Sequence, residues 1–187
     1  MQTLASLTET SSPAKWYDER SDFDHAIADC TEAIRLNPKN ADALDNRCYA
    51  YGDRGQFEQA IADCDAALRL SPGNADALNN RCWARTVAGR DLPLALADCD
   101  ASLRLRPGNG NALNTRCAVQ LKSGAFDRAI ADCAAALEKN PKDADSLYVR
   151  GIAKLKSGDT TGGEADIAAA KAIKADITDG WARYGVK

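Results

Sequence analysis

Hydrophobic and small residues recur along the chain at helical spacing, in pairs of segments separated by turn residues. Within residues 41–74, Leu44, Cys48 and Tyr51 are four and three residues apart, as on one face of a helix. A second series with the same spacing follows at Phe57, Ala60, Ile61, Cys64, Ala67 and Leu68. This pattern predicts two amphipathic helices joined by a short turn.

Turn and cap residues support these two helices. Gly55 lies between them, where a left-handed residue can end the first helix. Asn40 and Asn74 precede first helices, where an N-cap is wanted, and Pro72 ends the second helix.

The same unit recurs along the chain. The pentapeptide Ala26–Cys30 is matched at residues 60–64, 95–99 and 129–133, in steps of 34, 35 and 34 residues, and more weakly at 163–167. The extra residue of the 35-residue step falls after Gly89. A fixed period of this size predicts a solenoid of helix pairs, each unable to bury its apolar face alone.

These residues resemble the tetratricopeptide repeat family, whose 34-residue unit holds two antiparallel helices. The family's recurring leucine, small and proline positions are occupied in several units, as follows: Leu44, Leu78, Leu113 and Leu147; Ala60, Ala95, Ala129 and Gly163; Pro72, Pro107 and Pro141. The resemblance covers residues 13–176 and implies an all-α, right-handed α-solenoid. Cysteine replaces the family's glycine at Cys48, Cys82 and Cys117, and the position returns to glycine at Gly151. The Ala- and Arg-rich units look similar to those of bacterial short arrays.

The predicted division of the chain follows the repeat. It comprises a flexible N-terminal segment 1–12, an N-terminal helix pair 13–40, repeats at 41–74, 75–109, 110–143 and 144–176, and a C-terminal cap at 177–187. Trp181 and Tyr184 are expected to cover the last repeat; the alternative is a self-association surface.

Seven cysteines allow two interpretations: buried free thiols in a reducing cytoplasm, or disulfides. Residues facing each other across an antiparallel turn lie equally far from its midpoint. Around Pro72, Cys64 and Cys82 satisfy this condition, whereas around Gly55 Cys48 and Cys64 miss it by a few ångströms. Any bridges are therefore predicted to join residues 18 apart, leaving Cys133 over: Cys30–Cys48, Cys64–Cys82 and Cys99–Cys117.

Aspartate and arginine show the same 18-residue spacing, which predicts a ladder of ion pairs between consecutive repeats. The predicted pairs are Asp29–Arg47, Asp63–Arg81, Asp98–Arg116 and Asp132–Arg150. Exposed pairs of this kind contribute about 0 to 1 kcal/mol each.

Composition excludes several function classes. The net charge of −3 carries no basic stripe, which argues against nucleic acid as a partner, and no apolar run is long enough to span a membrane. With His25 as the one histidine, no metal site, cofactor or catalytic set is predicted, so the chain is not expected to be an enzyme. The N-terminus lacks a signal-peptide pattern, which favours the cytoplasm; a chain from which a signal was cleaved would be periplasmic or secreted.

The resemblance implies a function in binding. In this family partners bind the concave surface formed by first helices, whose matching positions here are Asp42, Asp45, Tyr49, Asp53, Asp76, Asn79, Trp83, Asn111, Asn114, Lys122, Asp145, Tyr148, Ile152 and Lys156. This surface is acidic with aromatic anchors, so the expected partner is a basic or amphipathic peptide or helix. The alternatives are a solvated polar face without a ligand, and a structural or self-associating solenoid that forms homo-oligomers.

Overall fold

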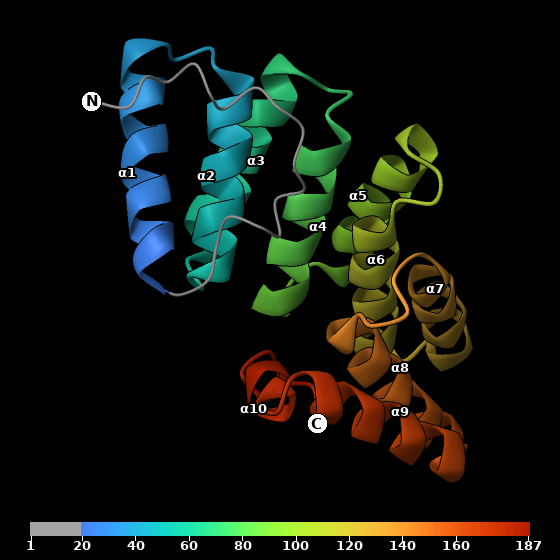
Figure 1. The fold of residues 1–187 in the computed structure, drawn as a ribbon. Helices are drawn as coiled ribbons and strands as arrows, with labels where there is room; N and C mark the ends of the chain where they lie inside the picture. The colour runs from blue at the N-terminus through green and yellow to red at the C-terminus, as the bar shows by residue number, and fades with distance from the viewer. Residues whose placement is uncertain (1–19) are drawn as a thin grey trace.

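The computed structural model describes residues 20–187 and shows, over that range, an all-helical chain (Figure 1). Its helices are α1 (Arg20–Leu36), α2 (Ala41–Asp53), α3 (Phe57–Leu70), α4 (Ala75–Ala88), α5 (Leu92–Leu105), α6 (Gly110–Lys122), α7 (Phe126–Lys139), α8 (Ala144–Ser157), α9 (Thr160–Ile173) and α10 (Ile177–Ala182). The predicted segment 1–12 and the first helix of the predicted pair 13–40 lie outside the described residues.

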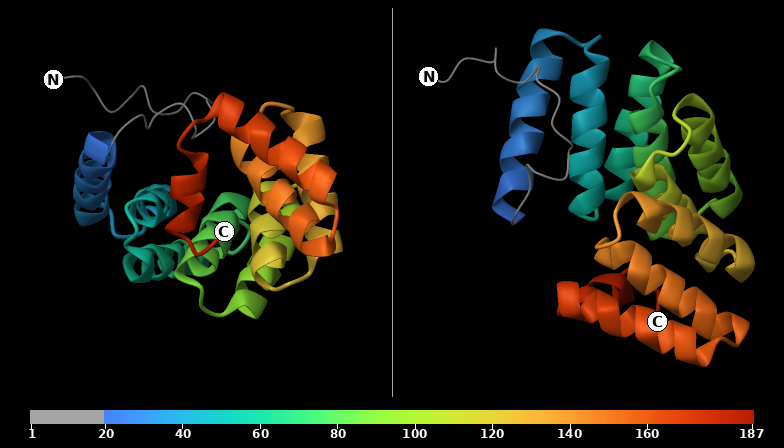
Figure 2. Two further views of the ribbon diagram at one scale, coloured as in Figure 1. Left: turned by 90° about the horizontal axis from the view of Figure 1, so that it is seen from below. Right: turned by 45° about the vertical axis from the view of Figure 1, so that its right-hand side comes forward.

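Consecutive helices pack antiparallel and form an all-α solenoid, as predicted (Figures 1 and 2). The even-numbered helices also contact one another, from α2 to α4, α4 to α6 and α6 to α8. Within residues 20–187, each of the outer helices α3, α5, α7 and α9 contacts only its neighbours in sequence, and no outer helix contacts another. The even-numbered helices are therefore crowded on the inner side of the curve. This inner row lines the concave surface.

Local sequence sets the helix ends. The side chain of Asn40 accepts a hydrogen bond from the Ala43 amide at 3.0 Å, and Asn74 accepts from two amides at the start of α4. Positive φ values of 67 to 98° occur at the turn glycines Gly55, Gly89, Gly124 and Gly158. The extra residue of the 35-residue step is absorbed beside Asp91, whose φ of 50° is the one positive value at a non-glycine residue in the described chain.

Three disulfide bonds are present, and each joins the inner and outer helix of one repeat. The bridges are Cys48–Cys64, Cys82–Cys99 and Cys117–Cys133, which are 16, 17 and 16 residues apart. The predicted 18-residue pairs Cys30–Cys48, Cys64–Cys82 and Cys99–Cys117 are therefore wrong. The cysteine left free is Cys30, not Cys133.

The error has a geometric cause. Equal distance from a turn fixes only how far along the helix axis a residue lies. Each of the outer helices α3, α5 and α7 packs against two inner helices, the one before it and the one after it in the sequence. The direction around the axis decides between them: Cys64 bonds to Cys48 on α2, and Ala60 on α3 and Ala84 on α4 pack against the bridge. In the unbridged last repeat, the two matching positions hold Gly151 and Ile167, which pack so closely that a Cβ on Gly151 would lie 2.7 Å from the Ile167 side chain.

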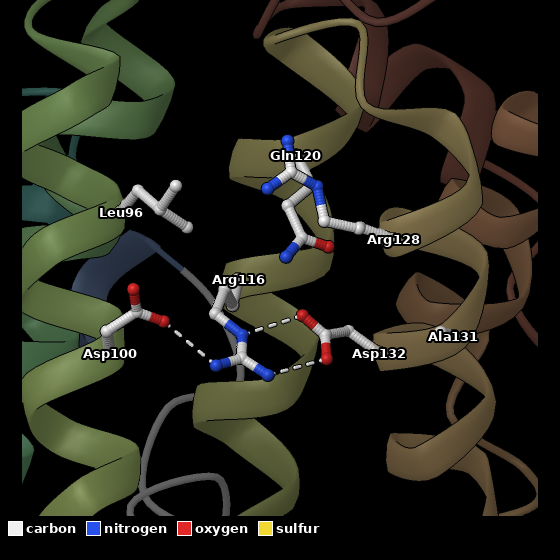
Figure 3. A pocket seen from close by; sticks show the side chains of 7 residues that line it. All are labelled: Leu96, Asp100, Arg116, Gln120, Arg128, Ala131 and Asp132. Atoms are coloured by element: carbon white, nitrogen blue, oxygen red, sulfur yellow. Dashed lines mark hydrogen bonds and ion pairs between the residues drawn. The ribbon is translucent and has the colours of Figure 1, made fainter.

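The arginine ladder is displaced in the same way. The arginines pair with aspartates of their own repeat at 2.5 to 2.7 Å: Arg47–Asp63, Arg81–Asp98, Arg116–Asp132 and Arg150–Asp166. The predicted pairs Asp29–Arg47, Asp63–Arg81, Asp98–Arg116 and Asp132–Arg150 are therefore wrong. A link to the preceding repeat does exist, but it uses the aspartate two residues later: Arg81 binds Asp65 at 2.7 Å and Arg116 binds Asp100 at 2.9 Å (Figure 3).

We expect Arg116→Met to lower the free energy of unfolding by about 3 kcal/mol, more than the surface value that the sequence suggests. Asp132 is only 8% exposed, and removing one partner of a buried pair leaves an uncompensated charge. Urea denaturation followed by circular dichroism measures the effect. Arg128→Met, an exposed arginine beside the same network, is the control and should change stability by less than about 0.5 kcal/mol. Equal effects of the two substitutions would contradict the prediction.

Candidate functional site: the concave surface

The residues predicted to line the binding surface all lie on the inner helices α2, α4, α6 and α8. The structure divides them into two groups. Residues 177–187, the C-terminal segment, turn back into the curve and cover the inner row between α8 and α4, as the view from below shows (Figure 2). The start of α2 and the start of α4 lie beyond this segment.

The C-terminal segment is anchored by buried apolar side chains. Ile177, Trp181 and Val186 are 1%, 3% and 4% exposed. They belong to one hydrophobic cluster with α6 and α8, which includes Ala118 and Ile152. Sequence reasoning expected this segment to cover the end of the last repeat, and missed that it reaches the concave surface.

An aromatic cluster holds the segment against α4 and α8. The Trp181 ring lies 5.7 Å from that of Trp83 and 6.5 Å from that of Tyr148, between centroids. Tyr184 contacts Trp83 at 5.5 Å, in an edge-to-face arrangement that aromatic pairs prefer. Two predicted groove residues, Trp83 and Tyr148, are therefore covered by this chain's own aromatic residues.

Polar contacts orient the same segment. The indole N–H of Trp181 donates to Asp145 Oδ1 at 2.7 Å. Lys122 Nζ donates to the Tyr184 carbonyl at 2.9 Å and to the Thr86 carbonyl at 2.7 Å, so one ammonium joins the segment to α4. Burial lowers the pKa of Lys122.

Two carboxylates lie beside the aromatic cluster. Burial raises the pKa of Asp145, although the hydrogen bond from Trp181 and the charge of Lys174 oppose the shift. Burial likewise raises the pKa of Asp53, against hydrogen bonding to Tyr49 and the charge effect of Lys174. Within residues 22–187 neither carboxylate forms an ion pair with Lys or Arg. A ligand cation placed here would relieve part of the cost of burying them.

The remaining concave surface contains a polar cavity of about 480 Å³ at the start of α2 and α4. It is lined by Asp42, Asp45, Asn46, Ser71, Asn74, Asp76 and Arg106. Asp45 is 8% exposed and accepts hydrogen bonds from Asn80 at 2.8 Å and Asn74 at 3.3 Å. Burial, together with the charges of Asp76 and Asp42, raises the pKa of Asp45 to about 6.

This shift predicts that Asp45→Asn stabilises the protein at neutral pH. Because the folded-state pKa is raised, folding favours the protonated carboxyl group, and this contribution is complete below about pH 4 and lost as the pH rises through 6. Asn stays neutral, so the variant should gain up to about 3 kcal/mol at pH 7.5 and almost nothing at pH 4. Thermal denaturation at both pH values measures this, with the exposed Asp42→Asn as control. A gain of equal size at pH 4 would contradict the assignment.

Other predicted site residues are used internally. Asn114, expected to bond a peptide backbone, donates to Asp143 at 2.8 Å and to Ser146 at 2.6 Å. Asn79 has a buried amide oxygen without a partner among the described residues. The ring of Tyr49 lies 6.4 Å from that of Phe23 on α1. Asn111 and Lys156 are exposed on α6 and α8.

A smaller cavity of about 300 Å³ lies between α5, α6 and α7, away from the predicted surface (Figure 3). Gln120 lines it, is 7% exposed, and has an amide oxygen without a hydrogen-bond partner in the described part of the chain. The matching residues of the neighbouring repeats, Arg85 and Lys154, bind Asp98 and Asp166 of the ladder. Gln120 is neutral, so its position contributes no ion pair to the arginine ladder.

The described residues contain no group of three or more His, Cys, Asp or Glu side chains that could hold a metal ion. None of the helices within that range has the length and apolar character needed to cross a membrane.

Comparison with known proteins identifies the repeat. Two models described as tetratricopeptide repeat match residues 41–74 and 119–177. No curated protein sequence matches the chain.

Several solved structures share the fold. A thermophilic TPR protein of Thermus thermophilus, TTC0263, is 18% identical, with a TM-score of 0.72 over 88% of this chain and 90% of that one. MamA from Desulfovibrio magneticus RS-1 is 15% identical, with a TM-score of 0.68 over 84% and 88% of the two chains. YrrB, described as a TPR protein with an unusual peptide-binding site, is 20% identical, with a TM-score of 0.63 over 83% and 80%. At these identities the similarity shows the fold alone.

Proposed function

Because the chain belongs to the tetratricopeptide repeat family, whose members are generally non-catalytic protein–protein interaction modules, we propose that its concave surface binds a basic or amphipathic peptide or helix of a partner protein. In this role the chain is an adaptor, scaffold or assembly factor.

The observation that carries this proposal is the pair of half-buried carboxylates beside aromatic rings on the inner helices. Asp53 and Asp145 have raised pKa values and form no ion pair within residues 22–187. A cationic group of a ligand would restore the interactions that these carboxylates lose on leaving water, and the neighbouring rings supply apolar contact area. Family analogy alone would support binding of any partner.

A peptide library displayed on phage and selected on the immobilised full chain tests the proposal. We expect enriched peptides to combine Lys or Arg with aromatic residues, and to bind more weakly at high salt because the attraction is electrostatic. Tyr49→Ala combined with Asp53→Asn, both on α2, should weaken the selected peptides at least tenfold. Asp127→Asn, exposed on the outer helix α7, should leave binding unchanged. Selection of acidic peptides, or binding indifferent to the α2 variant, would refute the proposal.

We propose further that the protein works where thiols are oxidised, such as the periplasm or outside the cell, instead of the cytoplasm that its N-terminal sequence favours. Three buried disulfides support this, because such bonds persist in oxidising compartments and are rare in the cytosol. Protein isolated from its native cells without reductant should show one free thiol under denaturing conditions, and a mass lower by six hydrogen atoms than that of the reduced chain. Seven free thiols would restore the cytoplasmic interpretation.

A further inference from the structure

The C-terminal segment has the chemistry that the concave surface is proposed to bind. It presents Trp181 and Tyr184, three residues apart, to Trp83 and Tyr148. Its charged side chains, those of Asp179, Arg183 and Lys187, sum to +1, and its Trp181 and Tyr184 lie beside the carboxylates of Asp145 and Asp53. It is an aromatic, basic, partly helical peptide on an acidic, aromatic surface.

The structure of the segment also favours its release from the concave surface. Its one helix, α10, has six residues, and a helix this short is not stable by itself in water. Of the described helices, α10 packs its backbone only against α8 and α9, so its hold on α4 and α6 depends on side chains and on Lys122. The exposed residues 174–176 connect it to α9.

On the basis of the proposed function, we propose that residues 177–187 are an intramolecular ligand of the concave surface. The partner is a short basic helix with two aromatic residues three apart, and it displaces residues 177–187 when it binds. The segment thereby sets the affinity. If it is docked 99% of the time, a competing helix binds about 100-fold more weakly than it would bind the open surface.

A fluorescently labelled synthetic peptide of residues 175–187 tests this with the full-length chain. The double variant Trp181→Ala, Tyr184→Ala removes the two anchors while keeping the segment, and should bind the peptide at least tenfold more tightly than the unmodified chain. Lys171→Ala, an exposed change on the outer helix α9, is the control and should bind like the unmodified chain. The same peptide with Trp replaced by Ala should not bind. Equal binding to the unmodified chain and the double variant would overturn the proposal.

A second measurement uses the unmodified chain, in case the double variant does not fold. Trypsin should cleave after Lys174 and Arg183 several times faster when a saturating amount of the unlabelled peptide displaces the segment. Protection unchanged by the peptide would overturn displacement. Light scattering that finds a dimer for the unmodified chain and a monomer for the double variant would also overturn it, because the segment would then dock on a second copy. If library-selected peptides bind the surface while the 175–187 peptide binds neither protein, this inference fails and the proposed function stands.

Discussion

Reduction of the three disulfides is expected to lower the free energy of unfolding by about 3 kcal/mol for each bridge. The reason is that each closed loop of 16 or 17 residues restricts the unfolded chain. The combined loss, about 9 kcal/mol, is comparable with the whole stability of an ordinary domain. Urea denaturation with and without a phosphine reductant, followed by circular dichroism, measures the change.

The position of the bridges predicts the breadth of the unfolding transition as well as its midpoint. Each bridge joins two helices of one repeat and none crosses between repeats, so reduction weakens individual repeats within an array of nearest-neighbour contacts. The reduced protein should unfold over a broader range of urea concentration. Cys48→Ala with Cys64→Ala should reproduce about one third of the loss.

Cys30 provides the internal control for this experiment. It is the free cysteine of the seven, so Cys30→Ser should leave the reductant effect unchanged. Burial raises the pKa of this thiol, which disfavours the thiolate needed for exchange with the bridges. A reductant effect that disappears in Cys30→Ser would show that the bridges form differently in solution.

Trp181→Ala is expected to lower the free energy of unfolding by about 3 kcal/mol. It removes a ring that is 3% exposed, and with it one aromatic contact of Trp83 and one of Tyr148. It also removes the indole N–H that donates to Asp145, so a half-buried carboxylate loses a hydrogen-bond donor. Urea unfolding by circular dichroism gives the loss, and the fluorescence of Trp83 should shift to the red as water reaches it.

Trp181→Phe separates the two contributions. Phenylalanine keeps most of the ring contacts but has no N–H group, so it should lose only about 1 to 2 kcal/mol. A loss as large as that of Trp181→Ala would assign the stability to the hydrogen bond with Asp145. No loss in either variant would mean that the C-terminal segment is not docked in solution.

The candidate site could be predicted only in part, and Trp83 and Asn114 show why. The repeat unit places both residues on inner helices, which the structure shows them to occupy. Whether such a residue is available depends on groups distant in sequence. Trp83 is covered by Trp181, 98 residues later, and Asn114 is hydrogen-bonded to Asp143, just before α8, and to Ser146 on α8.

What the sequence by itself determined is the architecture: the 34-residue period, the turn glycines, the asparagine caps and the order of the helices. These features depend on spacing and local backbone preference, which neighbouring residues along the chain decide. Only the tertiary structure decided the cysteine and arginine pairs, because α3, α5 and α7 each pack against two inner helices and sequence spacing cannot choose between them. It alone also placed the C-terminal segment on the concave surface, because the curvature that brings Trp181 to Trp83 accumulates over several repeats.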